Sequence, residues 1–246
     1  MKITNLQLRP EMALAWAQNR KCRTQRVITK LKGFRRFGEP ISEFGPCENI
    51  PGYKTHEYSW QFRDKRMRWH QLTNYELLEG CPYGQPGDRL RLMTTWAVPM
   101  EYDDYRPSDL PHNRLFVEDI WTAFDGSKPS FLGRTRMGRY MPRWLRDAMP
   151  QPKILSIRAR RIQEITKSEM LEEGIREVTK DGIVKKFCIY DNGDYTSVSW
   201  QDMPRHPIDV FVPLWDSINA KRGYPWELNP WVWDIRFQSR EEMEAE

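Results

Sequence analysis

Hydrophobic and polar positions alternate along this chain with two periods, one typical of strands and one typical of helices. Residues 11–20 place Ala13, Leu14, Trp16 and Ala17 at helical spacing and predict a short helix. Four segments instead alternate residue by residue and predict strands: 24–28, 89–97, 154–162 and 231–237. We therefore expect short strands mixed with short helices and joined by long loops.

Two further helices are predicted towards the C-terminal end of the chain. Thr166 is a natural N-cap, Glu169 three residues later completes a capping box, and Gly174 is placed to end that helix. Residues 210–220 carry Phe211, Leu214, Trp215 and Ile218 at helical spacing. Between these helices, residues 183–201 predict a hairpin with its turn at 191–194.

The order of these elements predicts an α+β fold that is mainly β. Short strands with helices placed between them favour a compact, mostly antiparallel barrel with peripheral helices. The length of 246 residues suits one elaborated domain or two small ones. Aromatic residues make up 13% of the chain, and this dense apolar surface excludes a disordered protein.

Composition excludes further classes of protein. No apolar stretch approaches the roughly 20 residues that a membrane span needs, and residues 1–10 have no hydrophobic leader segment, so neither a membrane partner nor secretion is expected. The four cysteines and four histidines are scattered without close pairs, which predicts reduced thiols, no metal site and no cofactor. We expect a cytoplasmic protein of a bacterium or of a phage-infected cell.

The charge is distributed unevenly. Lys and Arg total 39 against 34 Asp and Glu, a net charge of +5. Basic residues concentrate in 1–36 and 134–161, whereas 101–125 is acidic. Guanidinium groups bind two phosphate oxygens at once, and aromatic residues among them can stack on bases. RNA, a modified nucleotide or DNA is therefore the predicted partner, with contacts from Arg134, Arg136, Arg139, Arg143 and Trp144.

Several blocks of sequence resemble one known family. Residues 19–28 (NRKCRTQRVI) are similar to the opening motif of ASCH domains, which belong to the PUA-like superfamily. Residues 81–90 (CPYGQPGDRL) with 95–97 (TWA) resemble a segment of phage-encoded ASCH-like proteins. Further blocks of the same prophage group match at 141–144, 162–166 with 172–174, 214–219 and 229–233.

The resemblance implies a PUA-like small β-barrel whose cleft binds RNA or modified bases. It implies a single domain over 1–240 with insertions at about 33–79, 101–135 and 176–205, and the acidic residues 241–246 then form a tail. One bacterial branch of the family removes acetyl groups from acetylcytidine with a Lys, a Thr and a Glu. By resemblance these are Lys21, Thr24 and Glu173, and Arg26 also matches the motif. Arg20 is a further predicted nucleic-acid-binding residue beside it. The family's usual glycine before the motif is Asn19 here.

Three functions remain open on this evidence. The leading hypothesis is a nucleic-acid-binding protein of phage or prophage origin. The alternative is a hydrolase, acting on an acylated nucleoside or on RNA, because a Thr hydroxyl becomes a nucleophile when a Lys of lowered pKa takes its proton. The third is a phage factor that binds a host protein, such as an inhibitor of host defence or a morphogenesis component, through the insertions at 33–79 and 101–135.

Overall fold

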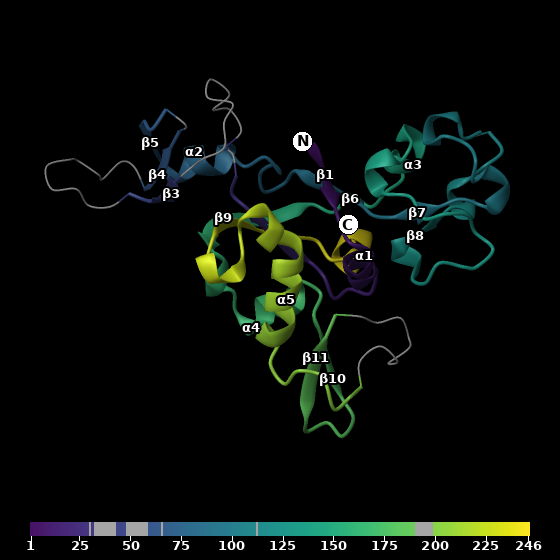
Figure 1. Cartoon of the computed structure of the whole chain (residues 1–246). Coiled ribbons are helices and arrows are strands. Elements are labelled where there is room, and N and C mark those ends of the chain that lie inside the picture. The colour runs from purple at the N-terminus through teal and green to yellow at the C-terminus, as the bar shows by residue number, and fades with distance from the viewer. Residues whose placement is uncertain (30, 32–42, 48–58, 65, 112, 190–198) are drawn as a thin grey trace, which may run out of the picture.

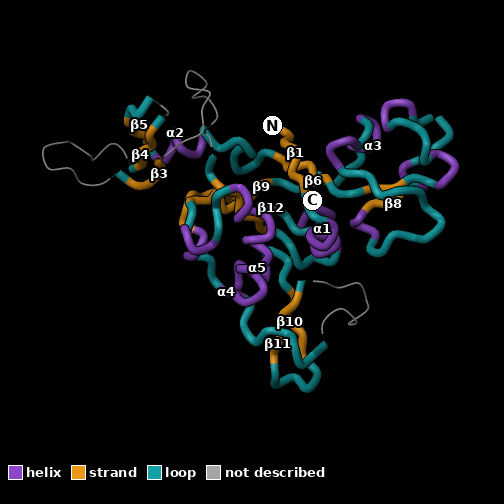
Figure 2. The backbone as a smooth tube through the Cα atoms, in the orientation of Figure 1, coloured by secondary structure: helices purple, strands orange, loops and turns teal. Residues whose placement is uncertain are grey.

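The computed structural model describes residues 1–246 except 30, 32–42, 48–58, 65, 112 and 190–198 (Figure 1). Its centre is an antiparallel sheet of β2 (Arg23–Val27), β12 (Trp231–Phe237) and β9 (Ile154–Arg161), with β12 in the middle. Beside it, β1 (Ile3–Gln7) and β6 (Arg89–Met93) pair in parallel. Helices surround these strands (Figure 2).

The two central sheets join into one row of strands. The chain that leads into β9 accepts hydrogen bonds from β6, Leu90 N to Pro152 O and Leu92 N to Pro150 O, both at 2.9 Å. The order across the row is therefore β1, β6, β9, β12 and β2. No backbone ladder joins β1 to β2 in the part of the chain described, and the Arg26 guanidinium instead donates to Gln7 O at 2.9 Å. The predicted mixture of strands and helices is confirmed, but the described strands form no closed barrel.

The register of the central sheet gives it one hydrophobic and one charged face. Ile235 of β12 pairs with both Thr24 and Ile157, so these side chains share a face. That face belongs to the largest hydrophobic cluster, together with Leu6 of β1 and Leu92 of β6. The alternation seen in the sequence thus points most apolar side chains of these strands towards one interior, while Val232 and Val27, on the opposite face, pack in a second cluster.

Helices form at the three predicted places, 11–20, 166–174 and 210–220, and the described residues include three more. Among the described residues they are α1 (Pro10–Ala17), α2 (Asn74–Glu79), α3 (Arg143–Asp147), α4 (Lys167–Glu172), α5 (Ile208–Asn219) and α6 (Arg240–Glu244). The capping box of α4 is confirmed, because Glu169 N donates to Thr166 Oγ1 and Thr166 N donates to Glu169 Oε2. Gly174 ends this helix with φ +111°, and a Cβ there would lie 3.0 Å from Ala15 Cβ.

Three small sheets lie around this centre; two fall within predicted insertions, and the other pairs a strand of the 101–135 insertion with the segment before it. The first contains β3 (Glu43–Pro46), β4 (Trp60–Arg63) and β5 (Trp69–Leu72), and it docks through Trp60, whose ring centroid lies 5.1 Å from that of Trp231. The second pairs β7 (Trp96–Ala97) with β8 (Trp121–Thr122). The third is the hairpin of β10 (Arg176–Thr179) and β11 (Lys185–Cys188). The predicted turn at 191–194 lies outside the described residues, and the hairpin described turns at 180–184.

The acidic C-terminal residues pack against the protein. Residues 240–244 form α6, which Ser239 caps, and Met243 packs on the main hydrophobic cluster. The Glu246 carboxylate forms ion pairs with Lys153 and with Arg89. Residues 241–246 therefore contribute to the fold as a helix and its end.

A buried ionic network occupies the charged face of the central sheet. Asp234 of β12 is fully buried and accepts hydrogen bonds from Arg23, at 2.8 Å, and from Arg158, at 2.7 Å. Two carboxylates of α4 complete the network. Glu169 pairs with Arg158 and Arg160, and Glu172 pairs with Arg23. Three arginines thus face three carboxylates, and α4 is held to the sheet by charge-assisted hydrogen bonds.

The Glu169 carboxyl makes the stability of this network depend on pH. Burial alone would raise its pKa, but hydrogen bonds from Thr166 and the charge and hydrogen bond of Arg160 lower it from 4.5 to about 2. A lowered carboxyl pKa stabilises the fold above the unfolded pKa, and this stability is lost as the pH falls from about 4.5 towards about 2. We expect urea unfolding at pH 6, 4 and 3 to show a smaller loss of stability at low pH in Glu169→Gln than in the wild type. Equal losses would contradict this prediction.

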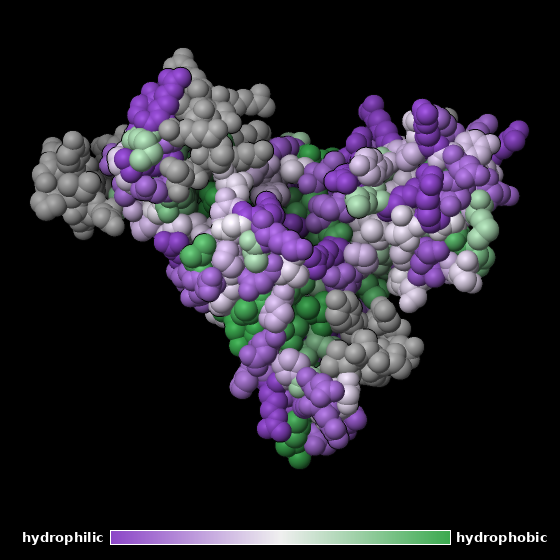
Figure 3. Space-filling model, in the orientation of Figure 1, coloured by the Kyte–Doolittle hydropathy of each residue, from purple (hydrophilic) through white to green (hydrophobic). Residues whose placement is uncertain are grey.

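Polarity differs between parts of the molecule. Figure 3 shows hydrophobic residues gathered over α4 and α5, while the lobe around β7, β8 and α3 is mostly hydrophilic. None of the helices in the described ranges combines the length and the apolar character that crossing a membrane requires.

Candidate functional site

A cavity of about 440 Å³ lies at the gap between β1 and β2, where the row of strands does not close. We call it the seam pocket. The end of β1, the segment 21–29, α1 and α5 line it. Among its lining residues are Gln7, Arg9, Lys21, Thr24, Arg26, Tyr83, Glu173, Phe211, Trp215, Asn219 and Arg222. The resemblance implies a cleft with Lys21, Thr24, Arg26 and Glu173, and the structure brings these four residues to one cavity.

Lys21 and Glu173 form a buried ion pair in the wall of this pocket. The Lys21 ammonium donates to Glu173 Oε2, to Glu173 O at 2.9 Å and to Arg23 O at 2.7 Å. The other carboxylate oxygen, Oε1, accepts the Gln25 backbone N–H at 2.7 Å. Local sequence explains the arrangement, because Glu173 is the C-cap residue of α4 and forms an isolated β-bridge with Lys21 at the entry to β2. The pair therefore joins α4 to β2.

Burial dominates the electrostatics of Lys21. Loss of hydration lowers the pKa of its ammonium, while the Glu173 carboxylate acts in the opposite direction. All three ammonium protons have acceptors, so the charged form is well satisfied by hydrogen bonds. The pair can fix the shape of the pocket wall without any chemical step.

Thr24 is positioned by its strand. Its pairing with Ile235 points the side chain to the interior face of the sheet, beside the seam pocket. The residue is buried, and its side chain carries a hydroxyl group at the wall of the pocket. Thr24 can therefore offer both a donor and an acceptor to a bound molecule.

Two arginines of the seam pocket, Arg26 and Arg222, contribute positive charge that no ion pair balances among the described residues. Arg26 donates to Gln7 O at 2.9 Å, and Arg222 donates to Asn219 Oδ1 at 3.4 Å. No carboxylate pairs with either of them within the described part of the chain. Burial raises the pKa of the Tyr83 phenol, and the charges of Arg26 and Arg222 act to lower it, which places both cations near this ring. Tyr83, Phe211 and Trp215 supply aromatic wall.

The other predicted cations occupy different positions. Arg20 does not line the seam pocket, and its guanidinium donates to Gly174 O at 2.7 Å and to Gln18 Oε1. Arg136 is buried. It donates to Tyr105 O at 2.9 Å and Asp103 O at 2.6 Å and lies over the ring of Trp96. These acceptors hold the 101–135 lobe together, so the position of Arg136 argues against the predicted phosphate contact.

The remaining residues of the basic block are exposed to differing degrees. The side chain of Arg134 is 66% exposed and lies 3.7 Å from Asp103, and that of Arg143 is 86% exposed. Trp144 is half-buried against a hydrophobic cluster, which limits its use as a stacking platform. Arg139 is exposed on the short helix Gly138–Tyr140, with its guanidinium 4.9 Å from the centroid of Tyr140.

The Gly138–Tyr140 turn is close to the seam pocket. A Cβ at Gly138 would lie 2.9 Å from the side chain of Gln7, which lines the pocket, and 2.5 Å from Thr94 O. Only glycine fits this approach, and Arg139 and Tyr140 follow it in the same turn. Helix α3 begins at Arg143, three residues after Tyr140.

Sequence reasoning missed Arg222, Tyr83 and Asn219 as lining residues of the pocket. Their contribution depends on where α5 and the turn at 82–88 pack, which no local pattern specifies. One pattern in the sequence could have indicated that α5 contributes to the pocket. The apolar stripe of this helix lines the cavity, and it consists of Phe211, Leu214, Trp215 and Ile218.

Within the described residues, no three His, Cys, Asp or Glu side chains group so as to hold a metal ion. The four cysteines form no disulfide, and burial raises the pKa of the Cys81 thiol to about 11. Comparison of the chain with protein-family models, with curated proteins and with solved structures finds no match.

Proposed function

We propose that this protein binds nucleic acid as an ASCH-type member of the PUA-like superfamily, and that the seam pocket takes a base or nucleotide of RNA, or a modified base. One observation carries the proposal: four residues that the family motif places at a cleft, Lys21, Thr24, Arg26 and Glu173, line a single cavity. We further propose the cytoplasm of a bacterium or a phage-infected cell as its setting.

The chemistry of the pocket suits a nucleotide. Arg26 and Arg222 have no carboxylate partner in the described chain, and guanidinium groups bind phosphate oxygens through paired hydrogen bonds. Tyr83, Phe211 and Trp215 provide apolar surface for a flat ring, while Thr24 and Asn219 offer polar groups at its edge. A volume of about 440 Å³ lies within the range of small-molecule sites.

Two features of the backbone support the family assignment. The strands β1, β6, β9, β12 and β2 follow one another in a row around a common hydrophobic cluster, as in a barrel opened at one seam. Asn19 stands where the family motif has glycine, and it adopts φ +58°, the left-handed conformation that glycine favours. The local backbone at the motif is therefore of the kind the resemblance implies.

A neighbouring surface extends the site for a longer strand. Arg139 and Tyr140, on the turn that Gly138 brings against Gln7, are exposed, and Arg143 is the next exposed cation along the chain. Cations interleaved with an exposed aromatic ring are typical of surfaces that bind single-stranded nucleic acid. Tyr140 replaces the half-buried Trp144 as the stacking residue in this proposal.

The geometry of Lys21 favours binding over hydrolysis. A base that activates Thr24 needs a free lone pair, but the three ammonium protons of Lys21 already bind Glu173 Oε2, Glu173 O and Arg23 O. The Lys21–Glu173 pair acts as part of the wall, and Thr24 serves as a hydrogen-bonding group for the ligand. The hydrolase remains the competing hypothesis.

Replacing the two unpaired arginines tests the proposal. We expect Arg26→Gln and Arg222→Gln each to weaken binding of a labelled single-stranded RNA about tenfold, because each loses a charge-assisted contact to phosphate. Fluorescence anisotropy at several salt concentrations should also show a smaller dependence of log affinity on log salt, by about one phosphate contact per variant. Arg114→Gln, which removes an exposed arginine outside the pocket, serves as the matched control.

Two results would contradict the proposal. Equal affinity of all three variants would mean that the seam pocket does not bind the strand. Release of acetate from acetylcytidine by the wild type, lost in Thr24→Ala, would favour the hydrolase instead.

A further inference from the structure

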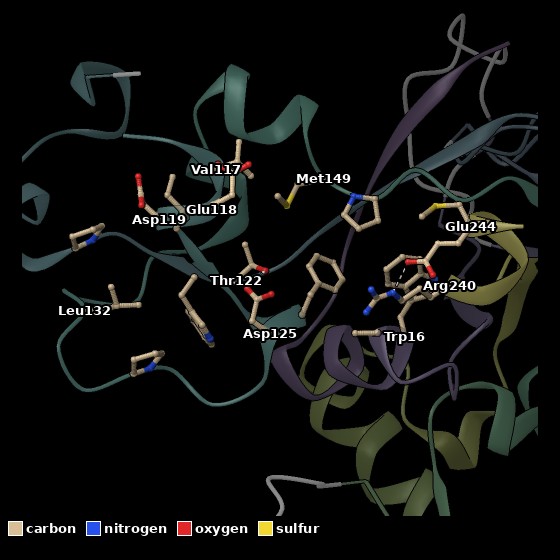
Figure 4. A pocket seen from close by; sticks show the side chains of 18 of the residues that line it. Trp16, Val117, Glu118, Asp119, Thr122, Asp125, Leu132, Met149, Arg240 and Glu244 are labelled. Atoms are coloured by element: carbon tan, nitrogen blue, oxygen red, sulfur yellow. Dashed lines mark hydrogen bonds and ion pairs between the residues drawn. The ribbon is translucent and has the colours of Figure 1, made fainter. Parts of the chain in front are cut away.

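A second cavity, of about 770 Å³, lies between the 101–135 lobe and the centre of the molecule. No residue lines both this cavity and the seam pocket. One wall comes from residues 117–125 and 129–132, and the other from the end of α1, residues 149–150 and α6. Figure 4 shows the two walls facing each other, with Glu118 and Asp119 on one side and Trp16, Arg240 and Glu244 on the other. We call this cavity the acidic groove.

The floor of the acidic groove is apolar and its rim exposes large apolar side chains. Ile120, Leu132, Met149 and Trp16 are buried where they line it. At the rim, Phe131 is 71% exposed, and the lining residue Val117 is also exposed. Exposed apolar groups gathered at a concave surface are typical of docking sites for another macromolecule.

The charge of the acidic groove is opposite to that of the whole protein. Glu118, Asp119, Asp125 and Glu244 line it against one cation, Arg240, and Arg240 pairs with Glu244 at 2.7 Å. In a chain of net charge +5, this cavity therefore carries three carboxylates in excess. A phosphate-bearing ligand or an anionic membrane would be repelled from it.

These carboxylates retain free acceptor capacity. Asp119 Oδ2 accepts the Phe116 N–H at 3.0 Å, and Asp125 Oδ2 accepts Thr122 N and Oγ1 at 2.8 and 2.9 Å. No Lys or Arg in the described ranges forms an ion pair with Glu118, Asp119 or Asp125. The nearby Lys128 ammonium donates instead to Leu132 O and Gly133 O.

We propose that the acidic groove binds a segment of a partner protein in which Lys or Arg residues alternate with large apolar residues. The carboxylates of Glu118, Asp119 and Asp125 would pair with the cations, and Phe131 and Val117 would pack on the apolar side chains. A small polyamine satisfies only the charges and leaves the exposed apolar rim uncovered, so the groove fits a peptide better. This interaction goes beyond nucleic-acid binding and uses none of the same residues.

Anisotropy of a fluorescein-labelled peptide of four Arg-Leu-Ser repeats, added to the full chain without nucleic acid, tests the proposal. We expect saturable binding that Glu118→Lys and Phe131→Ser each weaken about tenfold, because both are exposed residues whose loss removes charge or apolar contact. Two matched controls, Glu101→Lys and Ile183→Ser, change exposed residues outside the groove and should leave the affinity unchanged. Arg26→Gln should also leave it unchanged, which separates this test from that of the seam pocket.

Three outcomes would overturn the proposal. The first is the absence of saturable binding. The second is equal weakening by the groove and control variants, which would indicate general charge attraction. The third is a result showing that the apolar rim contributes nothing. Either a peptide of four Arg-Ser-Ser repeats would bind with equal affinity, or spermine would displace the labelled peptide as effectively as the unlabelled Arg-Leu-Ser peptide does. Glu101, Glu118, Phe131 and Ile183 are exposed, so unfolding curves should show that the variants at these four positions fold.

Discussion

Asp234→Ala is expected to lower the free energy of unfolding by about 3–5 kcal/mol, because it removes the central carboxylate of a buried ionic network. The side chains of Arg23 and Arg160 are about nine-tenths buried and both contact Asp234. Without that carboxylate, their charges stay in the interior with only Glu169 and Glu172 to balance them. The cost therefore comes from uncompensated charge more than from one lost hydrogen bond.

Urea unfolding of Asp234→Ala against wild type measures this effect, with Asp104→Ala as the matched control. Asp104 is exposed, so its replacement should change stability by no more than about 0.5 kcal/mol. A loss below about 1 kcal/mol in Asp234→Ala would mean that water reaches the network and screens its charges.

Strand positions were predictable from sequence because alternation is a local property. The expected strand at 231–237 matches β12 in full, and the capping box of α4 forms as Thr166 and Glu169 predict. The face of each residue also follows from alternation. Trp233 and Ile235 point to the hydrophobic cluster, and Asp234 points the other way. Alternation does not show whether the polar face of a strand is exposed to water or covered by another element. In this protein α4 covers the face that carries Asp234.

The same limit explains the two arginines that differ most from expectation. Arg134 and Arg136 are two residues apart in one basic block, yet Arg134 is exposed and Arg136 is buried. The difference arises from the carbonyls of residues 102–105, which approach Arg136 only after the 101–135 lobe has folded. Counting basic residues locates a candidate surface but does not distinguish a cation held inside from one that is free to bind.

Both cavities are equally non-local. The motif around Lys21 indicated one wall of the seam pocket, since Lys21, Thr24 and Arg26 lie within six residues of one another. The opposite wall comes from α5, far along the chain, and the acidic groove combines α1, the 101–135 lobe and α6. The sequence shows which sign of charge is in excess in each segment. The cavities that bring these charged residues together form only when distant elements pack against each other.

Lys21→Met is expected to destabilise the protein by about 3–5 kcal/mol, because it leaves the Glu173 carboxylate buried without its cation. The double variant Lys21→Met/Glu173→Gln removes both charges and keeps an acceptor oxygen for the Gln25 N–H that now binds Glu173 Oε1. We therefore expect the double variant to be more stable than Lys21→Met alone, by about 1–3 kcal/mol. Unfolding curves of the wild type, both single variants and the double variant give the coupling energy.

The folded double variant also separates the two possible roles of this pair. If Lys21 and Glu173 only shape the wall of the seam pocket, the double variant should bind single-stranded RNA with nearly wild-type affinity, since Arg26 and Arg222 are intact. Loss of RNA binding in a folded double variant would mean that the charges of the pair contact the ligand. Additive destabilisation, with no coupling between the two substitutions, would instead mean that the ion pair contributes little to the fold.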